Sequence, residues 1–193
     1  INQFQYDPNT EDFTAWGGAG AVAFERSQML QGLPARLIYM DLNGVDPNLG
    51  NMLPSHLNGP NLPPSGSPSY FVQFDDNSWG FSQDQLEIWR FSADWVNPDS
   101  SSFTHVANLA TEPFDSSMCR YSMNCIPQPM TMKKLDALSA RLMYRLQYRN
   151  FGNHETMVVN HTVDVNRSDH AGIRWYELRD TGSGWSIRQQ GTY

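Results

Sequence analysis

Four acidic residues stand at positions where carboxylate chemistry could take place. Asp75 and Asp76 end one strand-like segment, Glu155 follows a predicted turn, and Glu177 lies in another strand-like segment. A glycosidase needs two carboxyl groups about 5 to 9.5 Å apart, on either side of the bond that it cleaves. In the structural alternative, Asp75 and Asp76 cap a turn, and Glu177 pairs on the surface with Arg174 or Arg179. The sequence therefore names catalytic candidates without showing that they converge.

The stretch 149–165 carries two histidines and a glutamate close together. It lacks the second histidine of a zinc-binding HExxH motif, because Val158 occupies that position. The surrounding β-branched residues predict a strand, in which His154 and His161 point to opposite faces. Glu155 shares a face with His161 but would lie about 20 Å from it along the strand. We therefore expect no metal site here. We expect a hairpin turn that leaves His154 and Glu155 near a loop end, with His154 as a candidate ligand-binding residue.

Six tryptophans offer a different chemistry, because an exposed indole ring is a flat apolar platform for a sugar. Trp16 and Trp79 are flanked by glycine in loop-like segments, whereas Trp89 and Trp175 lie in strand-like segments. We therefore expect Trp16 and Trp79 to be candidate ligand-binding residues and the other two to fill the core.

Cofactor motifs are sparse. The segment DPNTED, residues 7–12, has oxygen donors suited to Ca²⁺ but lacks the spacing of an EF-hand loop. No phosphate-binding loop, GxSxG elbow or Ser-His-Asp signature is present. The expectation is no cofactor, with Ca²⁺ as the one alternative.

The composition narrows the class of protein. The 193 residues include 39% hydrophobic but only 17% charged residues, whereas about 25% is usual in soluble domains. The net charge of −7 and the scattered basic residues argue against a nucleic-acid partner. No apolar run approaches the length of about 18 residues that a membrane span needs. Low charge combined with many Asn, Ser, Thr, Gly and aromatic residues is typical of extracellular β-proteins, so we expect a secreted or cell-surface location.

Cys119 and Cys125 are the two cysteines of the chain. Their five intervening residues do not fit the CxxC spacing of zinc or thioredoxin-like sites. A local disulfide that closes a small loop is favoured over two free thiols, and it would indicate an oxidising compartment.

The elements that must position these residues are mostly short strands. Strand-like segments gather into three units, each of up to four antiparallel strands, with two proline-rich connections that we expect to lack regular structure. The units are residues 1–49, 69–114 and 141–193, and the connections are residues 50–68 and 115–131. Helical spacing is present only in residues 132–143, which merge into a strand, and in a turn that ends at Gly32.

This repetition predicts an all-β, β-propeller-like fold with about three four-stranded blades and one short helix. A β-sandwich with uneven strands is the alternative. Three blades do not close a ring, and the chain opens at Ile1 without an initiator methionine. We therefore expect residues 1–193 to form a single region of a longer chain, whose other blades would be its partners.

Several motifs resemble a family of large secreted bacterial β-propeller-like proteins of unassigned activity. They include PSYFVQFDD (68–76), LEIWRFSADW (86–95) and RLMYRLQYRNFGNHETMVVNHTVDV (141–165). The resemblance covers nearly the whole chain and implies an extracellular, multi-stranded region of a longer polypeptide. It brings no catalytic residues. Sialidase-like propellers are a more distant resemblance, and the chain has no Asp-box.

Together these observations predict an extracellular module that binds a glycan or a protein without catalysis. The alternative is a sialidase- or glycosidase-like hydrolase with paired carboxylates, so enzymatic activity is left open. The two hypotheses differ in whether Asp75, Asp76, Glu155 or Glu177 converge at the separation that a glycosidase requires.

Overall fold

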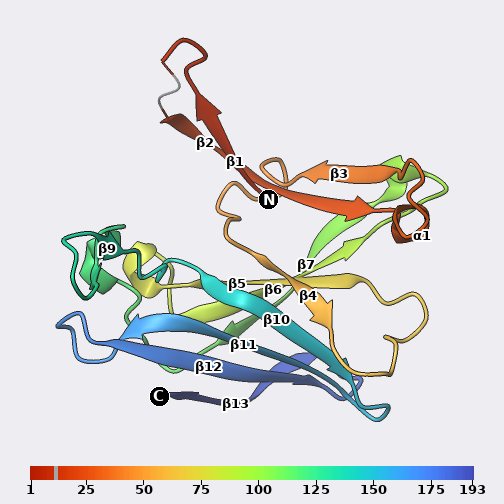
Figure 1. Cartoon of the computed structure of the whole chain (residues 1–193). Coiled ribbons are helices and arrows are strands. Elements are labelled where there is room, and N and C mark those ends of the chain that lie inside the picture. The colour runs from red at the N-terminus through yellow and green to blue at the C-terminus, as the bar shows by residue number, and fades with distance from the viewer. Residues whose placement is uncertain (11–12) are drawn as a thin grey trace.

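The computed structural model describes residues 1–10 and 13–193 and confirms the predicted all-β class (Figure 1). The described strands form a three-stranded sheet, an eight-stranded sheet and a two-stranded hairpin. Within the same residues, no helix is long and apolar enough to cross a membrane.

The three-stranded sheet comes from the N-terminal part of the chain. Its antiparallel strands are β1 (Asn2–Tyr6), β2 (Phe13–Phe24) and β3 (Leu37–Asp41), with β2 in the middle. The short helix α1 (Arg26–Met29) connects β2 to β3, and Gly32 follows it with a φ of +66°. The helical turn predicted before Gly32 is therefore present.

The eight-stranded sheet has the order β13–β12–β11–β10–β4–β5–β6–β7, and its neighbours are antiparallel except for the pair β4–β10. Its first four strands along the chain are β4 (Leu53–Leu57), β5 (Ser69–Asp75), β6 (Gln85–Ser92) and β7 (Ser102–Ala110). The last four are β10 (Leu142–Asn150), β11 (Glu155–Asp164), β12 (Ala171–Asp180) and β13 (Trp185–Thr192). The 3₁₀ turns η1 (Asn77–Trp79) and η2 (Pro98–Ser100) lie in its connections.

Separate propeller blades are not confirmed. Strands β4–β7 and β10–β13 are each a four-stranded run, but Leu146 of β10 pairs with Ser55 of β4 in a parallel register. The two runs therefore form one continuous sheet. The expectation that residues 50–68 lack regular structure was wrong, because residues 53–57 form the strand that joins the two runs. That strand pairs with β5 over only two residues, Leu53 and Pro54. Because this ladder is so short, the sheet tolerates the missing backbone N–H of Pro54.

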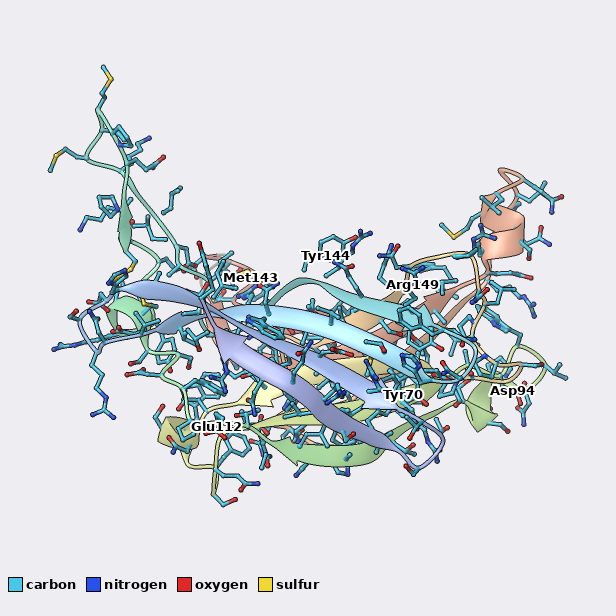
Figure 2. All side chains as sticks on the ribbon, turned by 90° about the horizontal axis from the view of Figure 1, so that it is seen from below. Tyr70, Asp94, Glu112, Met143, Tyr144 and Arg149 are labelled. Carbon is cyan, nitrogen blue, oxygen red and sulfur yellow. A yellow bond between two sulfur atoms is a disulfide. The ribbon has the colours of Figure 1, made fainter. Side chains whose placement is uncertain are left out.

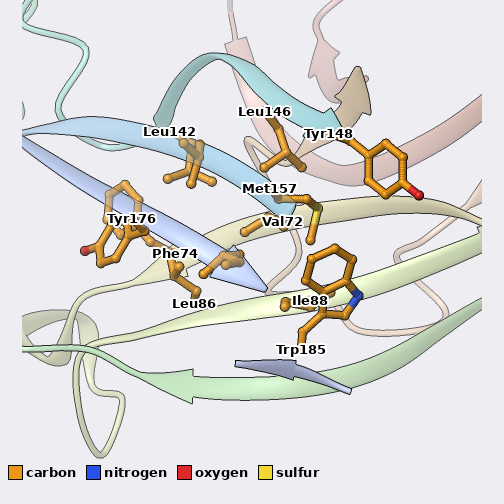
Figure 3. Close-up of a cluster of buried hydrophobic side chains, with 12 residues drawn as sticks. Val72, Phe74, Leu86, Ile88, Leu142, Leu146, Tyr148, Met157, Tyr176 and Trp185 are labelled. Atoms are coloured by element: carbon orange, nitrogen blue, oxygen red, sulfur yellow. The ribbon is translucent and has the colours of Figure 1, made fainter. Parts of the chain in front are cut away.

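The eight-stranded sheet curls around the main hydrophobic core. Because side chains alternate between the two faces of a strand, Met157, Val159 and His161 of β11 all point to the concave face. Figure 3 shows this cluster of buried side chains inside the curl. Its members are Val72, Phe74, Leu86, Ile88, Leu142, Leu146, Tyr148, Met157, Val159, Tyr176, Leu178 and Trp185.

Arg174 links the two ends of the curl. Its buried guanidinium donates to the Glu112 carbonyl oxygen, just beyond β7, at 3.1 Å and to Gln190 Oε1 of β13 at 2.6 Å. The Glu112 N–H also donates to Gln190 Oε1 at 3.0 Å. The guanidinium lies over the Tyr176 ring, 5.5 Å from its centroid. These contacts hold the edge strand β13 near the end of β7 and give the sheet its half-barrel shape.

The three-stranded sheet packs on the convex face of β5–β7. There Trp89 of β6 stacks on Phe103 of β7 with a centroid separation of 5.5 Å. The buried apolar residues of this second core are Ala19, Ala21, Ile38, Leu42, Leu49, Phe71, Trp89, Phe91 and Phe103. Strands β5 and β6 are therefore buried on both faces, in the two-layer packing of a β-sandwich. On the convex face of β10–β12, by contrast, Tyr144 is exposed (Figure 2).

The segment between β7 and β10 along the chain forms a third lobe. It contains η3 (Met118–Tyr121) and the hairpin of β8 (Ile126–Pro127) and β9 (Lys134–Leu135), which projects from the body (Figures 1 and 2). The predicted disulfide between Cys119 and Cys125 is confirmed.

The helix predicted over residues 132–143 was wrong. The Asp136 side chain accepts a hydrogen bond from the Leu138 N–H at 2.8 Å, and Leu138 has a φ of +51°, which a right-handed helix does not allow. Met132 and Leu135 are exposed, so an amphipathic helix would have no core to pack against. From Leu142 onward, pairing with β11 and β4 draws the chain into the large sheet instead.

Candidate functional site

A cavity of about 280 Å³ opens where the three-stranded sheet meets the ends of β5 and β10. Its lining combines aromatic walls with a few polar groups, and it comes from segments far apart in the sequence. The lining side chains that matter most are Trp16, Trp79, Phe81, Asn51, Asp75 and Arg141. The fold thus brings together three residues that sequence analysis named separately: Trp16, Trp79 and Asp75.

Trp79 is held by a chain of hydrogen bonds that ends at Asp76. Trp79 Nε1 donates to Tyr121 Oη at 2.8 Å, and Tyr121 Oη lies 2.9 Å from Ser116 Oγ. Since Ser116 Oγ donates to Asp76 Oδ2 at 2.6 Å, the Tyr121 hydroxyl is the donor to Ser116. The indole also stacks on Phe74 with a centroid separation of 5.2 Å. The ring is therefore oriented before any ligand arrives, while 40% of its surface stays exposed.

Asp76 anchors this chain and caps a turn. Its carboxylate accepts hydrogen bonds from the Ser78 N–H of η1 at 2.8 Å and from the Ser116 N–H at 3.0 Å. Burial alone would raise the pKa of Asp76, but the hydrogen bonds from Ser116 and Ser78 outweigh it, and the pKa lies below its usual range. Asp76 therefore stays charged and holds η1, rather than serving as a proton donor.

Trp16 reaches the cavity from β2. Its ring meets the Phe4 ring edge-on, with centroids 5.3 Å apart. It also lies so close to Gly50 that a Cβ at that position would come within 3.2 Å of Trp16 Cζ2. Any larger residue at position 50 would therefore press against the indole. Trp16 is 39% exposed, so two half-exposed indoles, Trp16 and Trp79, contribute walls of one cavity.

Asp75 and Gln73 form the polar floor, and Gln85 holds Asp75 from behind. Asp75 is only 1% exposed; its Oδ1 accepts from Gln73 Nε2 at 3.2 Å and its Oδ2 accepts from Gln85 Nε2 at 2.8 Å. Gln73 Nε2 also donates to Glu87 Oε2 at 3.1 Å, so one amide bridges two carboxyl groups. Burial raises the pKa of Asp75 to about 7, with a further rise from the Glu87 charge and opposing effects from the two amides. Near neutral pH, Asp75 is thus ionised in only about half of the molecules.

Glu87 was missed by sequence reasoning. It lies in β6 opposite Gln73, is 8% exposed, and accepts a hydrogen bond from Trp89 Nε1 at 3.0 Å. Strand alternation places Glu87 and Trp89 on one face while Ile88 joins the main core on the other. That alternation is visible in the sequence, but it usually places an acid in solvent. Only the three-stranded sheet above β6 buries this one.

A second cavity of about 220 Å³ shares Asn51, Arg141 and Leu142 with the first. Asn51 is fixed by Asn2, whose Oδ1 accepts from the Asn51 N–H at 3.0 Å and whose Nδ2 donates to Asn51 Oδ1 at 2.6 Å. Arg141, which sequence reasoning also missed, is exposed. The two cavities therefore lie side by side along the seam between the sheets, with Asn51 and Arg141 at their boundary.

Glu177 lies away from this seam, on the convex face of β12. Its Oε1 pairs with Arg179 Nη2 at 2.6 Å, and its Oε2 accepts from Gln189 Nε2 at 2.7 Å. The hydrogen bond from Arg179 lowers the pKa of Glu177 below its usual range. This carboxylate is therefore charged and already occupied.

His154 and Glu155 lie at the opposite end of the large sheet. Glu155 pairs with Asn150 at one end of β10, whereas the seam cavity is lined by Leu142 at the other end, about 30 Å away along the strand. His154 and Glu155 line a separate shallow cavity of about 250 Å³. The His154 ring stacks on Phe151 with a centroid separation of 4.8 Å. Glu155 thus does not converge with Asp75, and the carboxyl group that does is Glu87.

His161 belongs to the core. It is fully buried, stacks on Phe74 with centroids 4.4 Å apart, and its Nε2 lies 3.0 Å from Tyr176 Oη. Burial lowers the pKa of His161 to about 3, so its ring is neutral across the physiological range.

Within residues 1–10 and 13–193, no group of three or more His, Cys, Asp or Glu side chains is placed to hold a metal ion. The Ca²⁺ ligands suggested for residues 7–12 include Glu11 and Asp12, which lie outside the described residues. Asp7, the first of them, accepts a hydrogen bond from the Asn9 N–H at 2.7 Å in a local turn.

No protein-family model, curated protein or solved structure is significantly similar to this chain. The resemblance to large secreted bacterial propeller-like proteins therefore remains a prediction. The seam cavity and its side chains are the basis for a proposed function.

Proposed function

We propose that this protein binds a carbohydrate, without catalysis, in the seam cavity between Trp16 and Trp79. The observation that carries the proposal is that two half-exposed indoles from distant segments line one cavity. Indole rings favour the apolar face of a sugar, while Asn51 and Arg141 offer hydrogen-bonding groups for its hydroxyls. Apolar walls with a few polar groups are the usual make-up of a small-ligand site.

The placement of the carboxyl groups favours binding over hydrolysis. Hydrolysis requires two carboxyl groups on opposite sides of the scissile bond. Asp75 lines the cavity but Glu87 does not; the two lie on adjacent strands and are joined by Gln73, and Glu87 is engaged by Trp89. Two carboxyl groups joined through one amide do not flank a sugar bond.

Glycan-array screening followed by calorimetry of the ligands found would test the binding proposal. Trp16→Ala and Trp79→Ala should each weaken binding roughly tenfold, because each removes one aromatic platform. Trp95→Ala is the matched control, since Trp95 packs under Arg36 and does not line the cavity. Unchanged affinity in both cavity variants, or absence of any glycan ligand, would reject the proposal.

Glycoside hydrolysis by Asp75 and Glu87 is the second candidate function. It is favoured by the raised pKa of Asp75 beside a second carboxyl group, an arrangement found in catalytic acids. Incubation of each bound glycan with the protein, followed by reducing-end detection, separates the two functions. Product release that Asp75→Asn and Glu87→Gln both abolish would replace the binding proposal with hydrolysis.

An extracellular location is also proposed. It is supported by the Cys119–Cys125 disulfide, because disulfides persist mainly in oxidising compartments. A place in a longer propeller-like chain remains a proposal from the resemblance alone. Carbohydrate binding does not depend on it, since residues 16–142 supply the cavity lining. Detection of the protein in the secreted fraction of its source cells would test the location.

A further inference from the structure

We infer that Arg141 makes the seam cavity selective for a sugar that carries a carboxylate, such as a uronic acid. This inference rests on the proposed carbohydrate binding and adds the charge class of the ligand.

Arg141 is a cation with nothing to neutralise it. Its side chain is exposed and makes no hydrogen bond, ion pair or ring contact within the part of the chain that the structure describes. Two arginines outside the seam are paired: Arg36 with Glu25 at 2.8 Å, and Arg179 with Glu177 at 2.6 Å. The chain has 20 acidic residues against 13 basic ones, so acidic partners are in excess. Arg141 nevertheless lies unpaired at a cavity wall.

The chemistry of the guanidinium selects the ligand group. The planar guanidinium donates two parallel hydrogen bonds to the two oxygens of a carboxylate. A neutral hydroxyl has a single oxygen and cannot accept both bonds in this geometry. Arg141 is the one cationic side chain among the lining residues of the first cavity, and it lines the second cavity as well. A ligand longer than one sugar ring would therefore pass Arg141 wherever it lies along the seam.

Asp75 does not cancel this preference. It is the one acidic side chain in the lining of the first cavity, but it is almost fully buried, and Gln73 and Gln85 occupy its oxygens. The charge that faces an incoming ligand is therefore that of the exposed Arg141. Because Asp75 is protonated in part of the molecules near neutral pH, it repels an anionic ligand less than a fully charged carboxylate would.

Calorimetry with paired sugars tests the inference. The panel consists of oligosaccharides containing glucuronate or galacturonate, each with its carboxyl-reduced, neutral counterpart. The intact protein should bind the uronate form of at least one pair about tenfold more tightly, and added salt should narrow the difference. Arg141→Gln should abolish the preference, with a smaller loss of affinity for the neutral form than for the uronate form. Arg141→Lys should recover only part of the preference, because an ammonium lacks the planar geometry.

Arg188→Gln is the matched control, because Arg188 is exposed on β13 and lines neither cavity. Equal affinity for both members of every pair, or a preference that survives in Arg141→Gln, overturns the inference and leaves carbohydrate binding intact. If no uronate, neutral sugar or array glycan binds, the proposed function fails together with it.

Discussion

The two halves of the eight-stranded sheet have the same number of strands but different surroundings. Strands β5–β7 are covered on their concave face by the main core and on their convex face by the three-stranded sheet. Strands β10–β13 share the main core, but their convex face is open, with Tyr144, Val158 and Ile173 exposed on it. The seam cavity lies where the covered half meets the first strand of the open half.

Two glutamates show how this difference in surroundings changes the burial and the contacts of a carboxyl group. Glu87 and Glu177 both lie on the convex face of a central strand of their half. In the open half, Glu177 pairs with Arg179, and this contact lowers its pKa. In the covered half, Glu87 is buried beside Asp75, whose pKa rises to about 7. The second layer, rather than the strand pattern, thus turns a surface acid into a buried one beneath the cavity.

The largest expected effect compares one tryptophan from each half. Trp89→Ala should lower the free energy of unfolding by about 3 to 5 kcal/mol, because Trp89 is buried between two layers and stacks on Phe103. Trp175→Ala should cost about 1 kcal/mol, because Trp175 is half-buried on the open face, where its ring lies close to Gly191. Urea unfolding of both variants measures this. Equal losses would show that the three-stranded sheet does not bury Trp89 as described.

The pH dependence of stability gives the next largest effect. The pKa of Asp75 is about 7 in the folded protein, above about 3.9 in the unfolded chain. The folded state therefore binds more protons between about pH 4 and pH 7, and this group makes the protein less stable as pH rises through that window. Asp75→Asn removes the effect, so its stability relative to the parent should increase from pH 4 to pH 8 by roughly 2 to 4 kcal/mol.

Glu177→Gln is the matched control from the open half. The pKa of Glu177 is lowered, so its contribution is present above the unfolded pKa and is lost as pH falls. The variant should therefore lose less than about 1 kcal/mol at pH 7, and progressively less as pH falls. Thermal or urea unfolding across pH measures both variants. A flat difference between Asp75→Asn and the parent would contradict a buried acid at the cavity floor.

A smaller effect is expected from the hydrogen-bond chain behind Trp79. Tyr121→Phe removes the acceptor for Trp79 Nε1 and the donor to Ser116. One such bond is worth about 1 kcal/mol, so carbohydrate affinity should fall about threefold to tenfold while global stability changes little. Calorimetry measures the affinity, and Tyr144→Phe on the open face is the control. Loss of affinity in the control as well would place the ligand elsewhere.

The smallest effect concerns the open face itself. Tyr144→Ser should change stability by less than about 0.5 kcal/mol, because the Tyr144 side chain is 79% exposed and no second layer covers it. Urea unfolding checks this, with Phe71→Ser in the covered half as the contrast. A cost near that of the Phe71 variant would mean that something packs on the open half.

The strands could be predicted from local pattern alone. Alternation at Met157, Val159 and His161 identified β11, and the Cys119–Cys125 spacing indicated the disulfide. Prediction failed where distant strands compete for a segment. Residues 53–57 lie within a proline-rich stretch yet form β4, and residues 132–141 do not form the predicted helix.

In the candidate site too, single residues could be recognised from the sequence, but their spatial arrangement could not. Trp16, Trp79 and Asp75 were recognised one at a time, since residue type and flanking glycines are local properties. Their convergence was not predictable, and neither were Glu87 and Arg141, whose sequence neighbourhoods look like ordinary surface strand.

The sequence by itself therefore determined most of the long strands, their alternating faces and the disulfide loop, because these depend on neighbours within a few residues. The tertiary structure alone decided which convex face the three-stranded sheet covers. That choice depends on apolar burial summed over β2, β3, β5, β6 and β7. It buries Asp75 and Glu87 away from water, leaves Glu177 in contact with it, and creates the cavity at the boundary.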